Sequence, residues 1–175
     1  YTVVTVNNVK IGIVGASTPD LGTITSIGDL VITPSDDWEA DDLADEIQPS
    51  VDALKNAGID KIILLAHMQK ISIEKSLATK LSGVDIIVSG GSNTRMGDDN
   101  DTLFPGDTAF DEDYPFVTTD ASGNPLLIVN VDGDYKYLGR LVAGFNKDGI
   151  IELDALNDEV NGAYASTAAN VTAVG

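Results

Sequence analysis

Two short apolar runs, each bounded by polar or glycine-rich sequence, dominate the pattern in the middle of the chain. They cover Lys61–Ala66 and Val84–Val88, and continuous apolar runs of this length are typical of strands buried on both faces of a sheet. Between them, Ile73, Leu77 and Leu81 recur with the spacing of a short amphipathic helix. This order predicts two parallel strands joined by a right-handed crossover.

The first part of the chain predicts further strands. Val3–Val6 and Val9–Val14 are apolar stretches separated by Asn7 and Asn8, a pair typical of a hairpin turn. The mixed stretch that follows predicts a long loop with a short strand at Asp29–Thr33. Because Val9–Val14 runs into the small residues GAST, we expect it to end at the same kind of sheet edge as the later strands.

A longer amphipathic helix is predicted before the strand–helix–strand unit. It begins after Pro34, where Asp36 and Glu39 have the spacing of a capping box, and it ends at Gly58. Pro49 lies within the pattern, so we expect the helix to be kinked or split there. The core-facing stripe consists of Leu43, Ile47, Val51 and Leu54.

The pattern changes after residue 94. Residues 95–112 are acidic and punctuated by glycine and proline, which predicts a long loop that is either a solvated surface or an ion or substrate loop. Short β-rich stretches separated by turn residues then predict an antiparallel meander. Its strands are expected at Pro115–Thr119, Leu126–Val131, Tyr137–Phe145 and Ile150–Leu153. We assign residues 1–156 to one domain and residues 157–175, which are small and weakly patterned, to a linker or tail.

Composition narrows the classes of protein. The 175 residues suffice for one domain with a sizeable core, and 43% of them are hydrophobic. The formal net charge of −18 disfavours binding to nucleic acid or to an anionic membrane. Such a charge suits solubility at high salt or binding of divalent cations, and a merely solvated acidic surface explains it as well. The lack of cysteine excludes disulfides and thiolate metal sites.

Composition and the start of the chain also bear on location. No apolar run approaches the roughly 20 residues needed to span a bilayer. The chain begins at Tyr1 inside a predicted strand and without a signal peptide, which indicates a mature, processed or excised piece. The composition fits an extracellular bacterial protein, so we expect an extracellular or periplasmic location.

Polar and glycine-rich residues follow both buried strands of the central unit. The first strand runs into His67, the only histidine in the chain, and the second opens into Ser89–Thr94, with the sequence SGGSNT. Ligands bind outside the carboxyl ends of the strands in parallel sheets. We therefore expect His67 and the SGGSNT loop to share one edge, where the candidate site lies.

Four blocks of the chain, in order, resemble the 5′-nucleotidase branch of the calcineurin-like metallophosphoesterases. The blocks are VKIGIVGASTPD, IILLAHM, VDIIVSGGSNT and VDGDYKYLGRLVAGF. The resemblance covers roughly Val9 to Leu153 and matches the second half of the catalytic domain. It implies an α/β fold of the α/β/β/α sandwich type, incomplete in this chain, whose other metal-binding blocks would lie in a preceding segment or a second chain.

The resemblance also implies a metal site. His67 falls on a metal-binding histidine, whereas the two histidines of the family's GHxH block fall on Gly91 and Asn93. The implied ligands are His67 and Asn93, with Asp98, Asp99 and Asp101 as weaker candidates. An oxygen-rich set favours Mn²⁺, Mg²⁺ or Ca²⁺ over Zn²⁺. Candidate phosphate-binding groups are Arg95, Gly90 and Gly91, and Arg95 is equally explained as an ion-pair partner.

Two functions of different classes follow from these residues. The first is an exported, metal-dependent phosphoric monoester hydrolase, similar to 5′-nucleotidases, that acts on a nucleotide or another phosphate monoester and needs the preceding segment for activity. The second is a catalytically inactive relative that serves as an extracellular structural or calcium-binding module. The loss of the GHxH histidines favours the second function, and the retained His67 favours the first.

Overall fold

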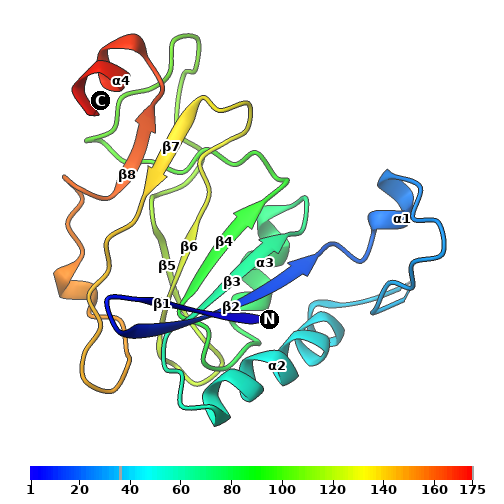
Figure 1. Ribbon diagram of the computed structural model, residues 1–175. Coiled ribbons are helices and arrows are strands. Elements are labelled where there is room, and N and C mark those ends of the chain that lie inside the picture. The colour runs from blue at the N-terminus through cyan, green and yellow to red at the C-terminus, as the bar shows by residue number, and fades with distance from the viewer. Residues whose placement is uncertain (36, 175) are drawn as a thin grey trace.

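Parallel strand–helix units form the centre of the molecule, as the apolar pattern predicts (Figure 1). The computed structural model describes residues 1–35 and 37–174, and within them a six-stranded sheet has the order β1-β2-β3-β4-β6-β5. Its strands are β1 (Thr2–Val6), β2 (Val9–Ser17), β3 (Ile62–His67), β4 (Ile86–Gly90), β5 (Phe116–Thr119) and β6 (Pro125–Val129). The four inner strands are parallel, and β1 and β5 add antiparallel edges. The expected mixed α/β class is confirmed.

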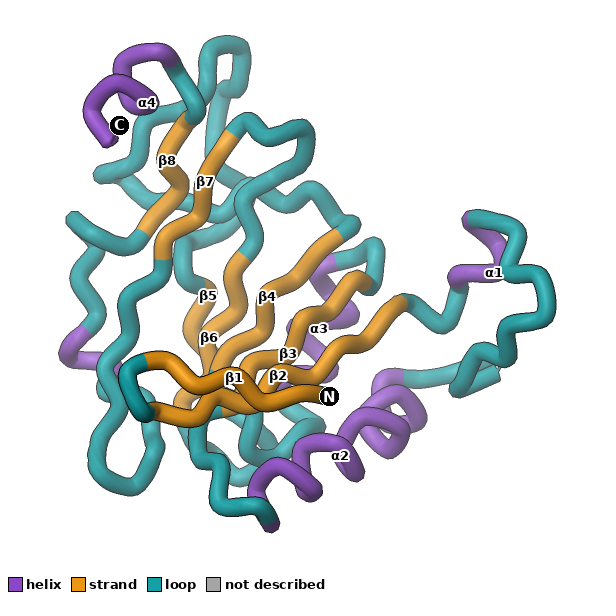
Figure 2. Tube along the Cα trace, viewed as in Figure 1, coloured by secondary structure: helices purple, strands orange, loops and turns teal. Residues whose placement is uncertain are grey.

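Two helices cover one face of this sheet (Figure 2). They are α2 (Ala40–Asn56) and α3 (Ile71–Ala78), and their apolar stripes pack on alternate residues of the inner strands, among them Leu64 and Ile87. Gly12 lets α2 approach the sheet, because a Cβ at this position would lie 2.7 Å from Leu54 Cδ1. This layer contains most of the buried apolar side chains and fixes the strands in register.

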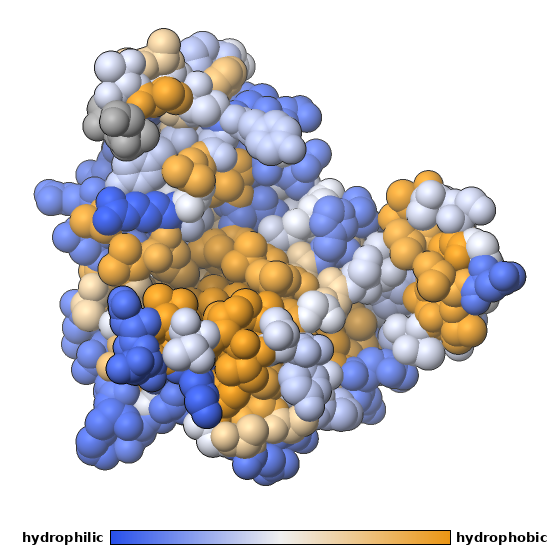
Figure 3. Space-filling model, in the orientation of Figure 1, coloured by the Kyte–Doolittle hydropathy of each residue, from blue (hydrophilic) through white to orange (hydrophobic). Residues whose placement is uncertain are grey.

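Among the described residues, no helix lies over the opposite face of the sheet, which is apolar. Along β3 and β4, Leu65 is 47% exposed and Val88 is 41% exposed, although they sit on central strands. Figure 3 shows hydrophobic residues gathered across the middle of this face. The sheet therefore has one face packed on helices and one face that is open along β3 and β4 but buried at Leu127 and Val129 on β6.

The hairpin between β1 and β2 is confirmed, and the strand expected at Asp29–Thr33 is wrong. Asn7 and Asn8 have φ angles of 49° and 66°, as a tight hairpin turn requires. Residues 29–33 contain no strand, and Val31 is 89% exposed. Because β1 already occupies the free edge of β2, no edge remains there for another strand. A short helix, α1 (Leu21–Ile24), precedes this loop.

The long helix forms as one element, so of the two effects expected at Pro49 the split is wrong, and the kink stays a prediction. Asp36 lies outside the described residues, and the capping box is made by Glu39 and Asp42, whose Oδ2 accepts the Glu39 N–H at 2.8 Å. Pro49 lies inside the helix between buried turns. Burial of Val51 and Leu54 against the sheet outweighs the hydrogen bond that proline cannot donate.

The second half of the predicted meander is wrong. The hairpin of β5 and β6 is present, but β7 (Tyr137–Arg140) pairs with β8 (Gly162–Ala165) in a separate two-stranded sheet. The reason is that β6 uses both its edges, one on β4 and one on β5, which leaves no edge for β7. Strand β8 and α4 (Ala168–Val174) lie within the segment for which we expected a linker or tail.

Ile150–Leu153 does not form the fourth strand of the predicted meander. It gives only a single bridge between Phe145 and Ile151, followed by a short 3-10 helix, η1 (Leu153–Ala155). Within the described residues, no helix combines the length and the apolar character needed to cross a membrane.

One buried carboxylate joins the turns at the opposite, amino-terminal end of the central strands. Asp120, only 4% exposed, accepts the Gly83 N–H on Oδ2 and the N–H groups of Ser122 and Asn124 on Oδ1, each at 2.8 Å. It thus joins the turn before β4 to the turn between β5 and β6. Carboxylate acceptors of backbone N–H groups are among the stronger hydrogen bonds in proteins.

Asp120→Ala is expected to lower the free energy of unfolding by about 2 kcal/mol, because it removes the buried acceptor of three partly buried N–H groups. Urea denaturation followed by circular dichroism measures this loss. Asp148→Ala, in an exposed turn where the carboxylate pairs only with its neighbour Lys147, is the control and should change stability by less than about 0.5 kcal/mol. Equal losses in the two variants would contradict the assigned role of Asp120.

Candidate functional site

The carboxyl ends of three parallel strands meet at one edge of the sheet. Ser17 ends β2, His67 ends β3 and Gly90 ends β4, and the register places Ser17 beside His67 and His67 beside Gly90. His67 is exposed to solvent. The predicted meeting of His67 and the SGGSNT loop at this edge is therefore observed.

Two glycines make room for the His67 ring. A Cβ on Gly90 would lie 2.9 Å from His67 Nδ1, and one on Gly91 would lie 2.8 Å from His67 Nε2. Gly91 also has a φ of 82°, and its Cβ would approach the Gln69 side chain to 2.9 Å. Any side chain at these positions would displace the imidazole, so the glycines position His67 whether or not they also contact a phosphate.

Asn93 lies on the other side of the loop, over the turn that follows β6. It is exposed with a φ of 52°, and its Oδ1 would lie 2.9 Å from a Cβ built on Gly133. The loop is tied to β6 by Asn130, whose Nδ2 donates to Ser92 Oγ at 3.0 Å. Asn93 thus has the turn-forming role that its sequence context allows. Its amide oxygen also points toward the neighbouring turn.

The three weaker acidic candidates line a different cavity. Asp98, Asp99 and Asp101 border a space of about 480 Å³ together with Asp111 and Glu112, apart from His67. Asp101 Oδ2 accepts the N–H groups of Asp98 and of Ala163 in β8, at 3.1 and 3.0 Å. Burial raises the pKa of Asp101. Asp101 therefore anchors β8, and the structure does not bring these carboxylates to His67.

Arg95 is bound by carboxylates. Its Nε lies 3.4 Å from Asp111 Oδ2 and its Nη1 lies 3.3 Å from Asp107 Oδ1. The hydrogen bond that Arg95 donates to the Asp111 carboxylate raises the pKa of Arg95. Asp107 also accepts hydrogen bonds from Lys136 and Tyr137. The ion-pair role of Arg95 is thus present, and a phosphate would have to compete with two carboxylates.

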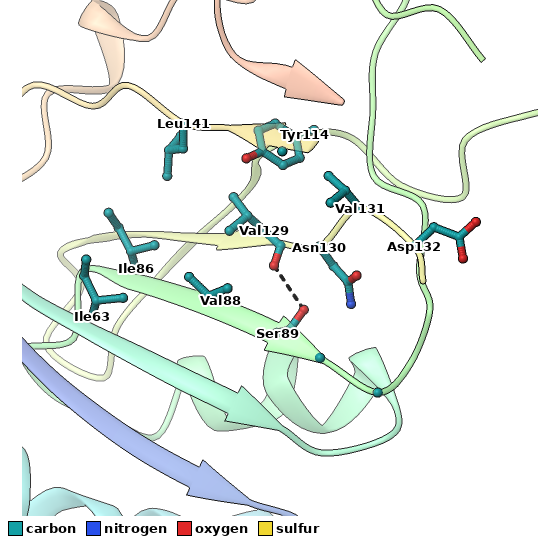
Figure 4. A pocket seen from close by; sticks show the side chains of 13 residues that line it. Ile63, Ile86, Val88, Ser89, Tyr114, Val129, Asn130, Val131, Asp132 and Leu141 are labelled. Carbon is teal, nitrogen blue, oxygen red and sulfur yellow. Dashed lines mark hydrogen bonds between the residues drawn. The ribbon is translucent and has the colours of Figure 1, made fainter. Parts of the chain in front are cut away.

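A partly open pocket of about 420 Å³ adjoins the two glycines on the helix-free face (Figure 4). Apolar side chains such as Val88, Tyr114 and Leu141 form its walls, and Asn130 and Asp132 form a polar end. Ser89 Oγ donates to the Val129 carbonyl at 3.2 Å below the pocket floor. Tyr114 could not be predicted as a residue of this pocket, because it precedes β5 and reaches this face only through the pairing of β5 with β6 and of β6 with β4.

A fully buried acid lies beneath the same edge. Glu74 on α3 is 0% exposed, and its Oε1 accepts the N–H of Met68, the residue after His67, at 3.2 Å. Its Oε2 is buried without a hydrogen-bond partner. Burial raises the pKa of Glu74 to about 7. Its i, i+3 relation to Leu77 was the signal in the sequence that could have placed it on the buried face.

Several known proteins are similar to this chain in sequence and in structure. No protein-family model matches the chain. The 5′-nucleotidases of Bos taurus and Diplobatis ommata are 31% and 34% identical to it over 149 and 155 residues, which cover 85% and 86% of the chain. The solved 5′-nucleotidase precursor of Thermus thermophilus matches 97% of the chain with a TM-score of 0.78 and 27% identity. The chain belongs to the 5′-nucleotidase family.

The NAD nucleotidase of Haemophilus influenzae is a further structural neighbour, with a TM-score of 0.70, 25% identity and 99% of this chain covered. The chain spans only 24% of the two curated 5′-nucleotidases, and 30% and 32% of the two solved chains. It is thus a part of the domain found in these proteins. Its resemblance to the 5′-nucleotidase branch is confirmed at the level of the family.

The 5′-nucleotidase family is metal-dependent in general, but the described residues of this chain show no complete metal site. Within residues 1–35 and 37–174, no three His, Asp or Glu side chains are grouped so that they could bind one ion. His67 offers one imidazole, and the carboxylates at 98, 99 and 101 face another cavity. The side chains present therefore do not fit a two-metal centre without further donors.

Gly91→Ala is expected to destabilise the protein more than Gly123→Ala by about 1 kcal/mol. Both glycines have a φ near 82°, so both variants carry the same backbone strain, but only the new methyl at position 91 would overlap His67 and Gln69. Thermal or urea unfolding of the pair isolates that contact. Equal destabilisation would show that the glycine does not make room for the His67 ring.

Glu74→Gln is expected to flatten the dependence of stability on pH. The pKa of Glu74 rises from its ordinary 4.5 to about 7 on folding, so its contribution to stability is complete below pH 4.5 and is lost as the pH rises through 7. Glutamine stays neutral, so the fall in unfolding free energy between about pH 4.5 and 8 should shrink by about 3 kcal/mol.

Urea denaturation at both pH values measures this effect. Asp85, whose pKa burial also raises to about 7, contributes with the same sign in both proteins and cancels in the comparison. An unchanged slope in Glu74→Gln would contradict the assigned pKa shift.

Proposed function

We propose that this chain supplies one edge of the active site of an exported, metal-dependent phosphoric monoester hydrolase that acts on nucleotides. The observation that supports this most directly is His67, an exposed imidazole at the end of β3, seated on Gly90 and Gly91 where the family resemblance expects a metal ligand. Membership of the 5′-nucleotidase family favours a nucleotide as the substrate.

In this proposal the chain supplies only some of the metal ligands of the site. His67 would be one ligand and Asn93 a second, with Mn²⁺, Mg²⁺ or Ca²⁺ favoured over Zn²⁺ by the oxygen donors. A divalent ion in such an enzyme supplies charge stabilisation and an activated water. The remaining ligands would come from a preceding segment or a second chain, since the family members compared are three to four times longer than this region.

An extracellular or periplasmic location is part of the same proposal. The neighbour from Thermus thermophilus is described as a precursor, which favours processing during export. The net charge of −18 suits a protein that stays soluble outside the cell.

A second function is favoured by a different observation. The cavity bordered by Asp98, Asp99, Asp101 and Glu112 is acidic, and position 91 lacks the histidine expected from the family's GHxH block. The missing histidine favours an inactive relative that serves as a structural module outside the cell. A calcium-binding role for this module would need further donors, because within the described residues no three of these carboxylates are grouped to bind one ion.

The two functions differ in catalysis, and the longest natural polypeptide that contains this region is the protein to test. Metal content and turnover of AMP and bis-p-nitrophenyl phosphate are measured with and without Mn²⁺ and Ca²⁺. We expect metal-dependent turnover that falls by at least about 100-fold in His67→Ala, as loss of a metal ligand predicts. Ser72→Ala, an exposed change in the next helix, should leave turnover intact.

Turnover that survives in His67→Ala would contradict the role given to this histidine. Bound calcium without any turnover would exclude the hydrolase and favour the structural module.

A further inference from the structure

Two side chains border the space over Gly91. A Cβ built on Gly91 would lie 2.8 Å from His67 Nε2 and 2.9 Å from Gln69 Nε2. The imidazole and the amide therefore converge on the place that a side chain at position 91 would occupy. That place adjoins the pocket of about 420 Å³, which is lined in part by Gly90 and Gly91. Both groups thus border a space that is open to a ligand.

The backbone of Gln69 has a strained conformation that its neighbours impose. Its φ is 69°, a left-handed conformation that Asn and Asp tolerate better than Gln and that glycine adopts without strain. On one side Met68 is buried, and Glu74 accepts its N–H at 3.2 Å. On the other side α3 begins at Ile71. Because glycine would make this turn with less strain, the presence of a long amide side chain here indicates a role for that side chain.

The amide of Gln69 is available to a ligand. The hydrogen bonds that hold this edge together are made by other groups, namely Glu74 with the Met68 N–H and Asn130 with Ser92. Within residues 1–35 and 37–174, no hydrogen bond uses the Gln69 side chain, which is only partly buried. Its two N–H donors can therefore bind a group that enters the space over Gly91.

Charge and donor type indicate what this space accepts. An amide NH₂ donates hydrogen bonds to phosphate oxygens, whereas Arg95, the charged candidate for that role, is already bound by two carboxylates. Among the described residues that line the pocket, Asp132 is the only carboxylate, and it is paired with Lys136 at 3.2 Å. A phosphate over Gly91 would thus meet a free neutral donor and no unpaired carboxylate of this pocket.

We propose that the Gln69 amide is a phosphate-binding group of this chain, and that its Nε2–H donates to a phosphate oxygen of the substrate held over Gly91 and beside His67. This inference rests on the proposed function, because it takes a phosphate monoester as the substrate. Gly91 then provides the opening through which the phosphate reaches Gln69. A fixed neutral donor at this point also stabilises the negative charge on the phosphoryl oxygens in the transition state.

Gln69→Glu tests the donor, because the two side chains have nearly the same size and only the amide has N–H groups to donate. The variant is made in the longest natural polypeptide that contains this region. We expect the affinity for inorganic phosphate, measured by calorimetry, to fall at least about 10-fold, and kcat/KM for AMP at least about 100-fold, since the carboxylate removes a donor and repels the phosphate. Asn8→Asp, an exposed amide-to-acid change at the opposite end of β2, is the control and should change neither quantity.

Gln69→Gly separates the side chain from the backbone. Gln69 and Asn8 have φ angles of 69° and 66°, so glycine fits both positions, and neither Gln69→Gly nor Asn8→Gly should lower the Tm by more than about 2 °C. We expect kcat/KM to fall at least about 10-fold in Gln69→Gly and to stay unchanged in Asn8→Gly. A stable protein with a specific loss of activity distinguishes phosphate binding from a structural role.

Unchanged phosphate affinity and turnover in Gln69→Glu would overturn the inference and leave Gln69 as a side chain that only fills the space beside Gly91. Tighter binding of Mn²⁺ with retained turnover in the same variant would also overturn it, because that result identifies the amide as a metal ligand. Circular dichroism confirms that each variant is folded, and Gln69→Gly provides the test if Gln69→Glu is not.

Binding of inorganic phosphate separates this inference from the function on which it rests. Phosphate affinity that is lost in Gln69→Glu, in a polypeptide that does not turn over AMP, supports the Gln69 contact and contradicts the hydrolase. Turnover that is equal in the natural polypeptide and in Gln69→Glu supports the hydrolase and contradicts the contact. A natural polypeptide that neither binds phosphate nor hydrolyses AMP overturns both.

Discussion

The parallel pairing of β2, β3, β4 and β6 is the constraint on which the rest of the structure depends. Each of these strands is held by apolar side chains packed on α2 and α3, and parallel order puts their carboxyl ends at one edge. His67 and the SGGSNT loop meet because of this order. The same pairing uses both edges of β6, which sends β7 away from the main sheet to pair with β8.

Local patterns were sufficient to predict the elements that local energetics decide. The continuous apolar runs predicted β3 and β4, the i, i+4 stripe predicted α3, and the Asn7-Asn8 turn predicted the first hairpin. The errors concern competition between distant segments for sheet edges, which leaves no trace in a window of ten residues. Residues 29–33 and 150–153 have strand-like composition, but neither segment pairs with a strand of the main sheet.

In the candidate site, too, some features could be predicted from the sequence and others could not. His67, Gly90 and Gly91 could be placed together from strand order alone. The close approach of the His67 ring to the Cα atoms of Gly90 and Gly91 could not be predicted, because it depends on the exact register of β3 and β4. Glu74 lies in a predicted helix and Tyr114 in a loop. Only the folded arrangement of these segments brings the two residues near the site. The acidic residues at 98, 99 and 101 are near Asn93 in sequence, but the backbone turns them toward another cavity.

The close packing of His67 against Gly91 also affects which substitutions the protein can accept at position 91. The family resemblance expects a histidine where Gly91 stands, but a side chain there would overlap both His67 Nε2 and the Gln69 amide. A histidine introduced at position 91 would therefore require the side chains of His67 and Gln69 to move. In the language of genetics, substitutions at positions 67, 69 and 91 are expected to be epistatic, because residues in contact do not contribute independently to stability.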